Sequence, residues 1–146
     1  VEPGANRLVV HGGEEVAAEA VSIAARIAEA VGHVGVLAVE MFVTAGSSRP
    51  RLVVNESAPR VHNSGHWTSD AALCSQFEQH IRAIAGWPLA DPVRHSDATM
   101  TNLLGEEILR ASILAAEPGV AVHVYGKKEA RPGRKMGHFT RIAPRS

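Results

Sequence analysis

The sequence predicts an α+β fold in two structural units, residues 1–90 and a small β-rich domain at residues 91–146. Three observations support this prediction. A hydrophobic stripe with a helical period occupies residues 16–31, two strand-like segments joined by a turn occupy residues 35–57, and short strand-like runs separated by turn residues follow residue 91. A chain of 146 residues is long enough for one modest domain, or for a subdomain with a small appendage.

The first predicted elements are a strand end at Leu8–Val10 and a helix that follows Gly12-Gly13. Glu14 and Glu15 suit the first turn of this helix, because acidic side chains complement the positive end of the helix dipole. The buried stripe has spacings of 4, 3, 4 and 4 residues and consists of Val16, Ala20, Ile23, Ile27 and Val31. Gly32 then favours the end of the helix.

A β-hairpin is predicted next, from apolar segments at residues 35–44 and 51–57 and the turn-like stretch Ala45–Pro50 between them. A hairpin centred near Ser48 has three facing pairs, which are Glu40 with Glu56, Phe42 with Val54 and Thr44 with Leu52. Because side chains alternate along a strand, both glutamates then point to the same face, with Cβ atoms roughly 4.5–5.5 Å apart.

Two carboxylates this close need a shared proton or a cation, since like charges directly opposed are destabilising. Oxygen ligands suit Mg²⁺, which commonly takes one or two carboxylates together with phosphate oxygens, so the pair predicts a Mg²⁺–nucleotide site. The alternative is that Glu40 and Glu56 lie on a solvated sheet face. A one-residue slip in register would also separate them.

A second helix is predicted from about Ala71 to Ala85, ended by Gly86 and Pro88. Its buried stripe consists of Leu73, Phe77, Ile81 and Ile84. The later elements are a strand at residues 98–104, a helix-like stretch at 106–117, a strand at 120–125, a basic loop at 126–137 and a strand at 138–142.

The composition argues against several classes of protein. No window approaches the roughly 18 apolar residues that a membrane span needs. The single Cys74 excludes an intramolecular disulfide and fits a reducing cytoplasm. The net charge of zero combines 8 basic and 14 acidic residues in the segment 1–125 with 7 basic and 1 acidic residue in the segment 126–146. Compact basic loops of the latter kind more often hold a small phosphate than nucleic acid.

The loop at residues 57–68 lacks a simple hydrophobic period and is dense in hydrogen-bond donors, which suits an anionic ligand. Here the sequence resembles a known family. The matching runs are VEMF at 39–42, NESAPR at 55–60, HNSGHWT at 62–68, SQFEQH at 75–80, NLLGE at 102–106, YGK at 125–127 and RPGRKMGH at 131–138. They resemble ATP-grasp enzymes, and more narrowly the N5-carboxyaminoimidazole ribonucleotide synthases.

The resemblance implies the C-terminal half of an ATP-grasp domain followed by a small β-rich C-terminal domain. It implies an enzyme of de novo purine biosynthesis that uses ATP and Mg²⁺ to carboxylate 5-aminoimidazole ribonucleotide with bicarbonate, through carboxyphosphate. Such enzymes are more than twice as long, so this chain is expected to be one portion of a parent enzyme and inactive alone. The parent is expected to be a cytoplasmic homodimer without nucleic-acid or membrane partners.

Residue roles carry over where the motifs match. Glu40 and Glu56 match metal ligands, and Asn55 with Glu56 matches a nucleotide contact, although strict alternation would turn Asn55 away from Glu56. Arg60 matches a catalytic group that holds bicarbonate or the transferring phosphoryl group, since a guanidinium binds such oxyanions bidentately. His62 matches a proton shuttle.

The remaining implied contacts are to the ribonucleotide. His62, Asn63 and Ser64 match the loop that faces the aminoimidazole, and Lys127 and Arg134 match the pair that grips the 5′-phosphate, with Arg131 close by. The other histidines show no spacing typical of a zinc site.

Two alternatives stay open at this point. One is a different ATP-grasp ligase, such as a formate-using transformylase or a biotin carboxylase, against which the HNSGHWT and RPGRKMGH runs argue. The other is a non-catalytic piece that acts only in binding or assembly.

Overall fold

The computed structural model describes residues 13–44 and 51–146. The predicted strand end at Leu8–Val10 and the turn at Ala45–Pro50 lie outside these residues. The described chain forms two compact units, one with residues 13–44, 51–65 and 76–92 and the other with residues 66–75 and 93–146. The predicted domain boundary at residue 90 stays a prediction.

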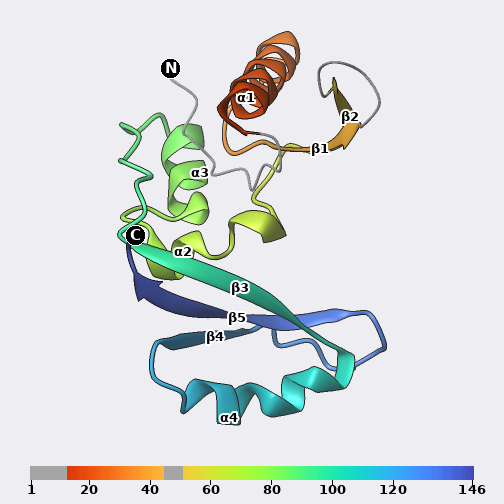
Figure 1. Ribbon diagram of the computed structural model, residues 1–146, viewed down its shortest axis with the longest axis vertical. Helices are drawn as coiled ribbons and strands as arrows, with labels where there is room; N and C mark the ends of the chain where they lie inside the picture. Colours follow the sequence, from red (N-terminus) through yellow and green to blue (C-terminus); the bar gives the residue numbers. More distant parts are fainter. Residues whose placement is uncertain (1–12, 45–50) are drawn as a thin grey trace. The chain divides into compact units, whose positions relative to one another are not determined.

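The first unit begins with helix α1, Gly13–Ala30, which covers the hairpin of strands β1, Ala38–Thr44, and β2, Arg51–Ala58 (Figure 1). Gly32 has φ 59° and closes the helix in a Schellman motif, because Gly32 N–H donates to Glu29 O and His33 N–H donates to Ala28 O. Val16 and Ala20 of the predicted stripe are buried, but Val31 is exposed because it lies beyond the end of the helix.

The hairpin pairs Glu40 with Glu56, as predicted, and then shifts register between Glu40 and Met41. The two other predicted pairs are wrong, because beyond the shift Phe42 faces Val53 and Thr44 faces Arg51. The shift is a β-bulge in which Asn55 is the extra residue, since Glu56 faces Glu40 and Val54 faces Met41.

The predicted second helix, from about Ala71 to Ala85, is shorter in the structure, where α3 spans Gln76–Ile84. The helix α2, Thr68–Ala71, precedes it as a separate element that belongs to the other unit. Ala72 has an extended backbone and forms a bridge with Arg94, while Leu73 N–H donates to Val93 O, so the intervening residues cannot continue the helix. The predicted burial is wrong too. The stripe residues are exposed in the described chain, by 64% at Leu73, 41% at Phe77, 59% at Ile81 and 56% at Ile84.

The second unit is built on an antiparallel sheet with the strand order β3-β5-β4 (Figure 1). Its elements are β3, Ser96–Leu104, the 3-10 helix η2, Gly105–Arg110, α4, Ala111–Ala115, β4, Val120–Val124, and β5, Lys135–Pro144. Leu103, Leu114 and Phe139 form the buried core, against which Ile108, Val120 and Val122 pack. The helix-like stretch and the strands were predicted, and β5 begins three residues earlier than expected.

The central strand β5 is buried from Met136 to Thr140, which includes the polar side chains of His138 and Thr140. Gly105 has φ 52°, and a Cβ there would meet the Arg131 carbonyl oxygen at 3.0 Å, so this glycine lets the basic loop approach the backbone after β3. None of the helices among the described residues combines the length and the apolar composition that crossing a bilayer requires.

Candidate active site

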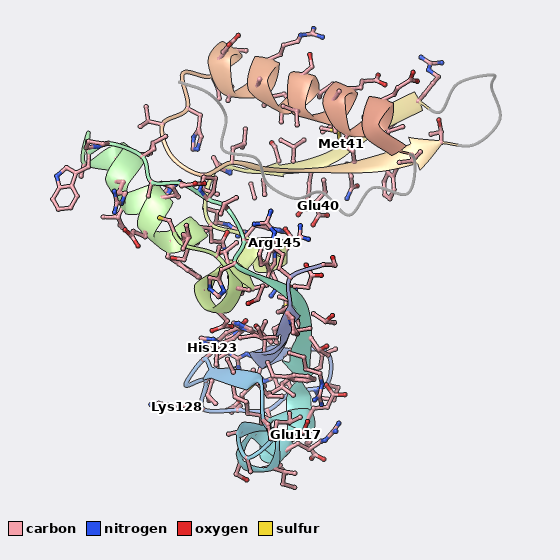
Figure 2. All side chains as sticks on the ribbon, turned by 60° about the vertical axis from the view of Figure 1, so that its left-hand side comes forward. Glu40, Met41, Glu117, His123, Lys128 and Arg145 are labelled. Atoms are coloured by element: carbon pink, nitrogen blue, oxygen red, sulfur yellow. The ribbon has the colours of Figure 1, made fainter. Side chains whose placement is uncertain are left out.

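The first candidate group is the carboxylate cluster, which consists of Glu40, Glu56 and His62 in the first unit. Each can offer one ligand atom, and these atoms all lie within 4.8 Å of one another. Figure 2 shows Glu40 pointing away from α1, while the next residue, Met41, lies on the side of the hairpin that α1 covers. The cluster is therefore on the open face of the hairpin, where both glutamates are exposed.

The bulge at Asn55 sits beside this cluster. Regular alternation would point Asn55 and Glu56 to opposite faces, but a bulge interrupts alternation and re-aims a side chain. The structure therefore contains, next to Glu56, the irregularity that a joint role of Asn55 and Glu56 requires.

His62 is oriented by its neighbours in the loop that follows β2. Ser64 N–H donates to His62 Nδ1 at 3.3 Å, and Ser64 Oγ lies 2.9 Å from the same nitrogen. A backbone N–H can only donate, so Nδ1 is an acceptor and the neutral ring carries its proton on Nε2. That nitrogen lies 3.4 Å from Glu40 Oε1, so the proton faces the carboxylate cluster.

Gln76, the first residue of α3, holds the backbone of His62 from both sides. Its Oε1 accepts from His62 N–H at 2.9 Å, and its Nε2 donates to His62 O at 2.7 Å. Gln76 is 6% exposed, and a Cβ on Gly65 would lie 2.6 Å from its Oε1. Gln76 was not among the predicted site residues, and no sequence signal marks it, because its burial follows from the tertiary contacts with His62 and Gly65.

Arg60 and the 3-10 helix η1, Asn63–Gly65, complete this loop. Arg60 N–H donates to Ala58 O at 2.8 Å, which makes a tight turn, and its guanidinium donates to Val61 O at 2.9 Å. The guanidinium is exposed on the same loop as His62, Asn63 and Ser64. The first unit thus contains all seven predicted residues from Glu40 to Ser64, and it brings the ligand atoms of Glu40, Glu56 and His62 within 4.8 Å of one another.

The second candidate group is the basic loop of the second unit, with Lys127, Arg131 and Arg134. Lys127 Nζ donates to Lys135 O at 2.6 Å, and Arg134 Nη1 donates to Glu129 O at 3.2 Å. Arg131 instead pairs with the Glu129 carboxylate, at 2.9 Å from its Nε. A carboxylate therefore offsets the charge of Arg131, whereas Lys127 and Arg134 donate to neutral carbonyl groups.

The second unit also contains a cluster that the sequence analysis did not foresee, which we call the histidine stack: Asp70, His123, His138 and Tyr125. His123 and His138 face each other across β4 and β5, with ring centroids 4.5 Å apart and planes inclined by 15°. Cross-strand pairing, which sequence spacing does not reveal, brings them together. Burial, followed by the nearby His123 and His66, lowers the pKa of His138 from 6.5 to about 4.

Asp70, His123 and His138 also offer ligand atoms within 4.8 Å of one another. A metal bound to imidazole lies in the plane of the ring. Because the two rings are stacked almost parallel, one position cannot lie in both planes. The cluster therefore fits a hydrogen-bonded stack better than a metal centre.

Two family models match the chain. The family model of the ATP-grasp domain matches residues 8–77, and that of the phosphoribosylaminoimidazole carboxylase C-terminal domain matches residues 98–146. The N5-carboxyaminoimidazole ribonucleotide synthase of Brucella melitensis is 53% identical over 130 residues, which cover 88% of this chain and 35% of the relative. The synthase of Escherichia coli is 46% identical, over 84% of this chain and 32% of the relative.

Solved structures agree. The N5-carboxyaminoimidazole synthase of Aspergillus clavatus, in complex with ADP and 5-aminoimidazole ribonucleotide, has a TM-score of 0.81 and 31% identity over 93% of this chain and 37% of that chain. The chain spans about a third of the length of the curated relatives. The predicted resemblance and fold class are thus confirmed: over residues 8–77 the chain belongs to the ATP-grasp domain family, and over residues 98–146 to the family of phosphoribosylaminoimidazole carboxylase C-terminal domains.

Proposed function

We propose that the whole protein to which this chain belongs uses ATP to join bicarbonate to the exocyclic amine of 5-aminoimidazole ribonucleotide, a step of de novo purine biosynthesis. The observation that carries the proposal is the carboxylate cluster at the Asn55 bulge, with Arg60 and His62 on the adjoining loop. Support comes from the similar A. clavatus synthase, whose structure contains ADP and this ribonucleotide.

Glu40 and Glu56 fit a Mg²⁺ ion. Their side chains are exposed on one face and supply hard oxygen ligands, and like charges at facing positions are relieved by a cation. When bound, Mg²⁺ would offset the negative charge of the nucleotide phosphates. His62 donates toward Glu40 through Nε2 and so orients one of the two ligands. Asn55, re-aimed by the bulge, contacts the nucleotide beside Glu56.

The loop after β2 then holds the reacting groups. The exposed Arg60 guanidinium binds bicarbonate, or the phosphoryl group in transfer, through two parallel N–H donors. Ser64 N–H donates to His62 Nδ1, so the ring proton is on Nε2. Nε2 can therefore exchange a proton at the reaction centre. Asn63 and Ser64 contact the aminoimidazole ring.

In the second unit, Lys127 and Arg134 bind the 5′-phosphate of the ribonucleotide, and Arg131 assists. A phosphate carries close to two negative charges. Lys127 and Arg134, which have no carboxylate partner among the described residues, suit it better than Arg131, which pairs with Glu129. The whole protein acts in the cytoplasm as a homodimer, with ATP, Mg²⁺ and bicarbonate as its other ligands.

The experiment that tests this function is an assay of ADP release by the whole protein with each substrate omitted in turn. ADP release that requires both the aminoimidazole ribonucleotide and bicarbonate supports the proposal. Release that requires formate in place of bicarbonate would assign the protein to another ATP-grasp reaction.

A second candidate concerns this chain alone, because it spans about a third of its curated relatives. On this hypothesis the chain is inactive and complements the remainder of the protein. Activity regained when the chain is mixed with the remainder, each inactive by itself, would support it.

A further inference from the structure

The histidine stack is a continuous chain of polar contacts inside the second unit. His123 Nε2 lies 2.9 Å from Asp70 Oδ1, and Asp70 is only 10% exposed. The His123 ring stacks on His138, and His138 Nδ1 is hydrogen-bonded to the Tyr125 hydroxyl at 2.8 Å. Figure 2 shows His123 on the sheet of this unit. The contacts thus lead from α2, across β4 and β5, to the residue that follows β4.

Burying the polar side chain of His138 in the sheet costs free energy, and the stability of the sheet does not explain why a histidine is there. His138 is 4% exposed, and its Nε2 has no hydrogen-bond partner among the described residues. A buried polar atom without a partner costs about 1–3 kcal/mol, and an apolar residue at this central position would avoid the cost. We therefore explain the imidazole at this position by the hydrogen bond between its Nδ1 and the Tyr125 hydroxyl.

Tyr125 in turn contacts a residue of the basic loop. The Lys127 ammonium lies 5.5 Å from the centroid of the Tyr125 ring, within the range of a cation–π interaction. The same ammonium donates to Lys135 O at 2.6 Å. These two contacts fix the ammonium on a side chain that otherwise has four freely rotating bonds, and leave further N–H donors for an anion.

The surroundings of His138 favour the neutral form of its ring. The groups that face it are His123 from β4, Tyr125, His66 at a centroid distance of 5.2 Å, and Asp70 from α2. The Asp70 carboxylate is an acceptor, so His123 donates to it through Nε2. A neutral His138 can bind the Tyr125 hydroxyl without adding repulsion against Lys127.

We propose that Asp70, His123, His138 and Tyr125 are positioning residues for phosphate recognition: the stack fixes the Tyr125 ring under Lys127, and thereby aims the ammonium at the 5′-phosphate. This inference rests on the proposed function, because it needs Lys127 as a phosphate ligand. None of the four residues need contact the substrate.

The test is steady-state kinetics of the whole protein with four variants. Tyr125→Phe removes the hydroxyl and keeps the ring. His138→Leu removes the partner of the hydroxyl, whereas His138→Asn places an amide near the position of Nδ1. Glu117→Gln is the control, because it breaks an exposed ion pair with Arg141 in the same unit.

We expect Tyr125→Phe and His138→Leu to raise the KM for the aminoimidazole ribonucleotide by about three- to tenfold, as the loss of one aligned contact does. The KM for ATP and kcat should stay at the wild-type values. His138→Asn should restore the ribonucleotide KM, and Glu117→Gln should not change it. The inhibition constant of inorganic phosphate, measured against the ribonucleotide, should rise by the same factor as the KM.

An unchanged ribonucleotide KM in folded Tyr125→Phe would overturn the inference, and so would an equal rise in the KM for ATP. If His138→Leu fails to fold, the comparison of Tyr125→Phe with wild type decides by itself. A wild-type protein that does not consume the ribonucleotide refutes the proposed function instead, so the two failures are distinguishable.

Discussion

Glu40 of β1 and Glu56 of β2 face each other at the rung where the hairpin changes register, and Asn55, between Glu56 and Val54, is the residue that the bulge leaves over. The pair therefore combines an unfavourable charge arrangement with a local irregularity of the backbone. Both features are typical of sites that bind a ligand rather than of strands that only stabilise a sheet.

Replacing Glu56 by Gln should separate stability from activity. The change removes the repulsion with Glu40, so the free energy of unfolding should stay equal or rise by about 0.2–1 kcal/mol. The whole protein should nevertheless lose ribonucleotide-dependent ATP hydrolysis. Urea unfolding measures the stability, and an ADP-release assay measures the activity. The matched control is Glu19→Gln, because Glu19 is an exposed residue of α1. Wild-type activity in Glu56→Gln would refute the assignment of Glu56 as a metal ligand.

Gln76→Leu should weaken the site through the backbone of His62. Two buried hydrogen bonds are lost, so the chain should be destabilised by about 1–3 kcal/mol, and kcat of the whole protein should fall because His62 is no longer held. Gln79→Leu is a matched control, since Gln79 on the same helix bonds both backbone groups of Ala90. Equal losses of kcat in the two variants would show that Gln76 has no specific role.

Arg134→Ala and Arg131→Ala should differ in their effect on the KM for the ribonucleotide. Arg134 donates to a carbonyl, whereas Arg131 pairs with Glu129, so removal of Arg134 takes away more charge from a bound phosphate. We expect about a tenfold rise in the ribonucleotide KM for Arg134→Ala and a smaller rise for Arg131→Ala. Initial rates at varied ribonucleotide concentration measure both. A larger effect of Arg131→Ala would reverse the assignment.

The buried His138 should make stability depend on pH. Burial lowers its pKa to about 4 in the folded chain, while the unfolded chain titrates near 6.5. The unfolded state therefore binds more protons in this window, and the stabilisation present above pH 6.5 is lost as the pH falls toward 4. Urea unfolding across this window should show a steeper loss for wild type than for His138→Asn. Parallel losses would contradict the shifted pKa.

The carboxylate pair was predicted from a regular hairpin centred near Ser48, but the register next to the turn, continued without a bulge, would pair Glu40 with Asn55. The bulge at Asn55 is what places Glu56 opposite Glu40, and the sequence did not indicate it, because a single extra residue leaves the apolar pattern of Val53 and Val54 intact. The pairs beyond it, Phe42 with Val53 and Thr44 with Arg51, therefore moved by one position.

Tertiary contacts overrode local pattern in two other places. The stripe from Leu73 to Ile84 has a helical period, yet Leu73 and Ala72 pair with the segment that precedes β3, and the helix starts only at Gln76. The histidine stack joins residues from α2, β4 and β5, so neither spacing nor composition could indicate it. Long motifs, by contrast, mark the loop after β2 and the basic loop, and the site roles of the residues in these loops stay predictions.

The most direct test is carbon NMR of isotope-labelled bicarbonate that is incubated with the whole protein, ATP and 5-aminoimidazole ribonucleotide. We expect a new carbamate signal that grows in step with ADP in the wild type and is absent in Glu56→Gln. ADP release without the carbamate signal, or a signal that persists in Glu56→Gln, would contradict the assignment of Glu40 and Glu56 as the centre of an ATP-dependent carboxylation.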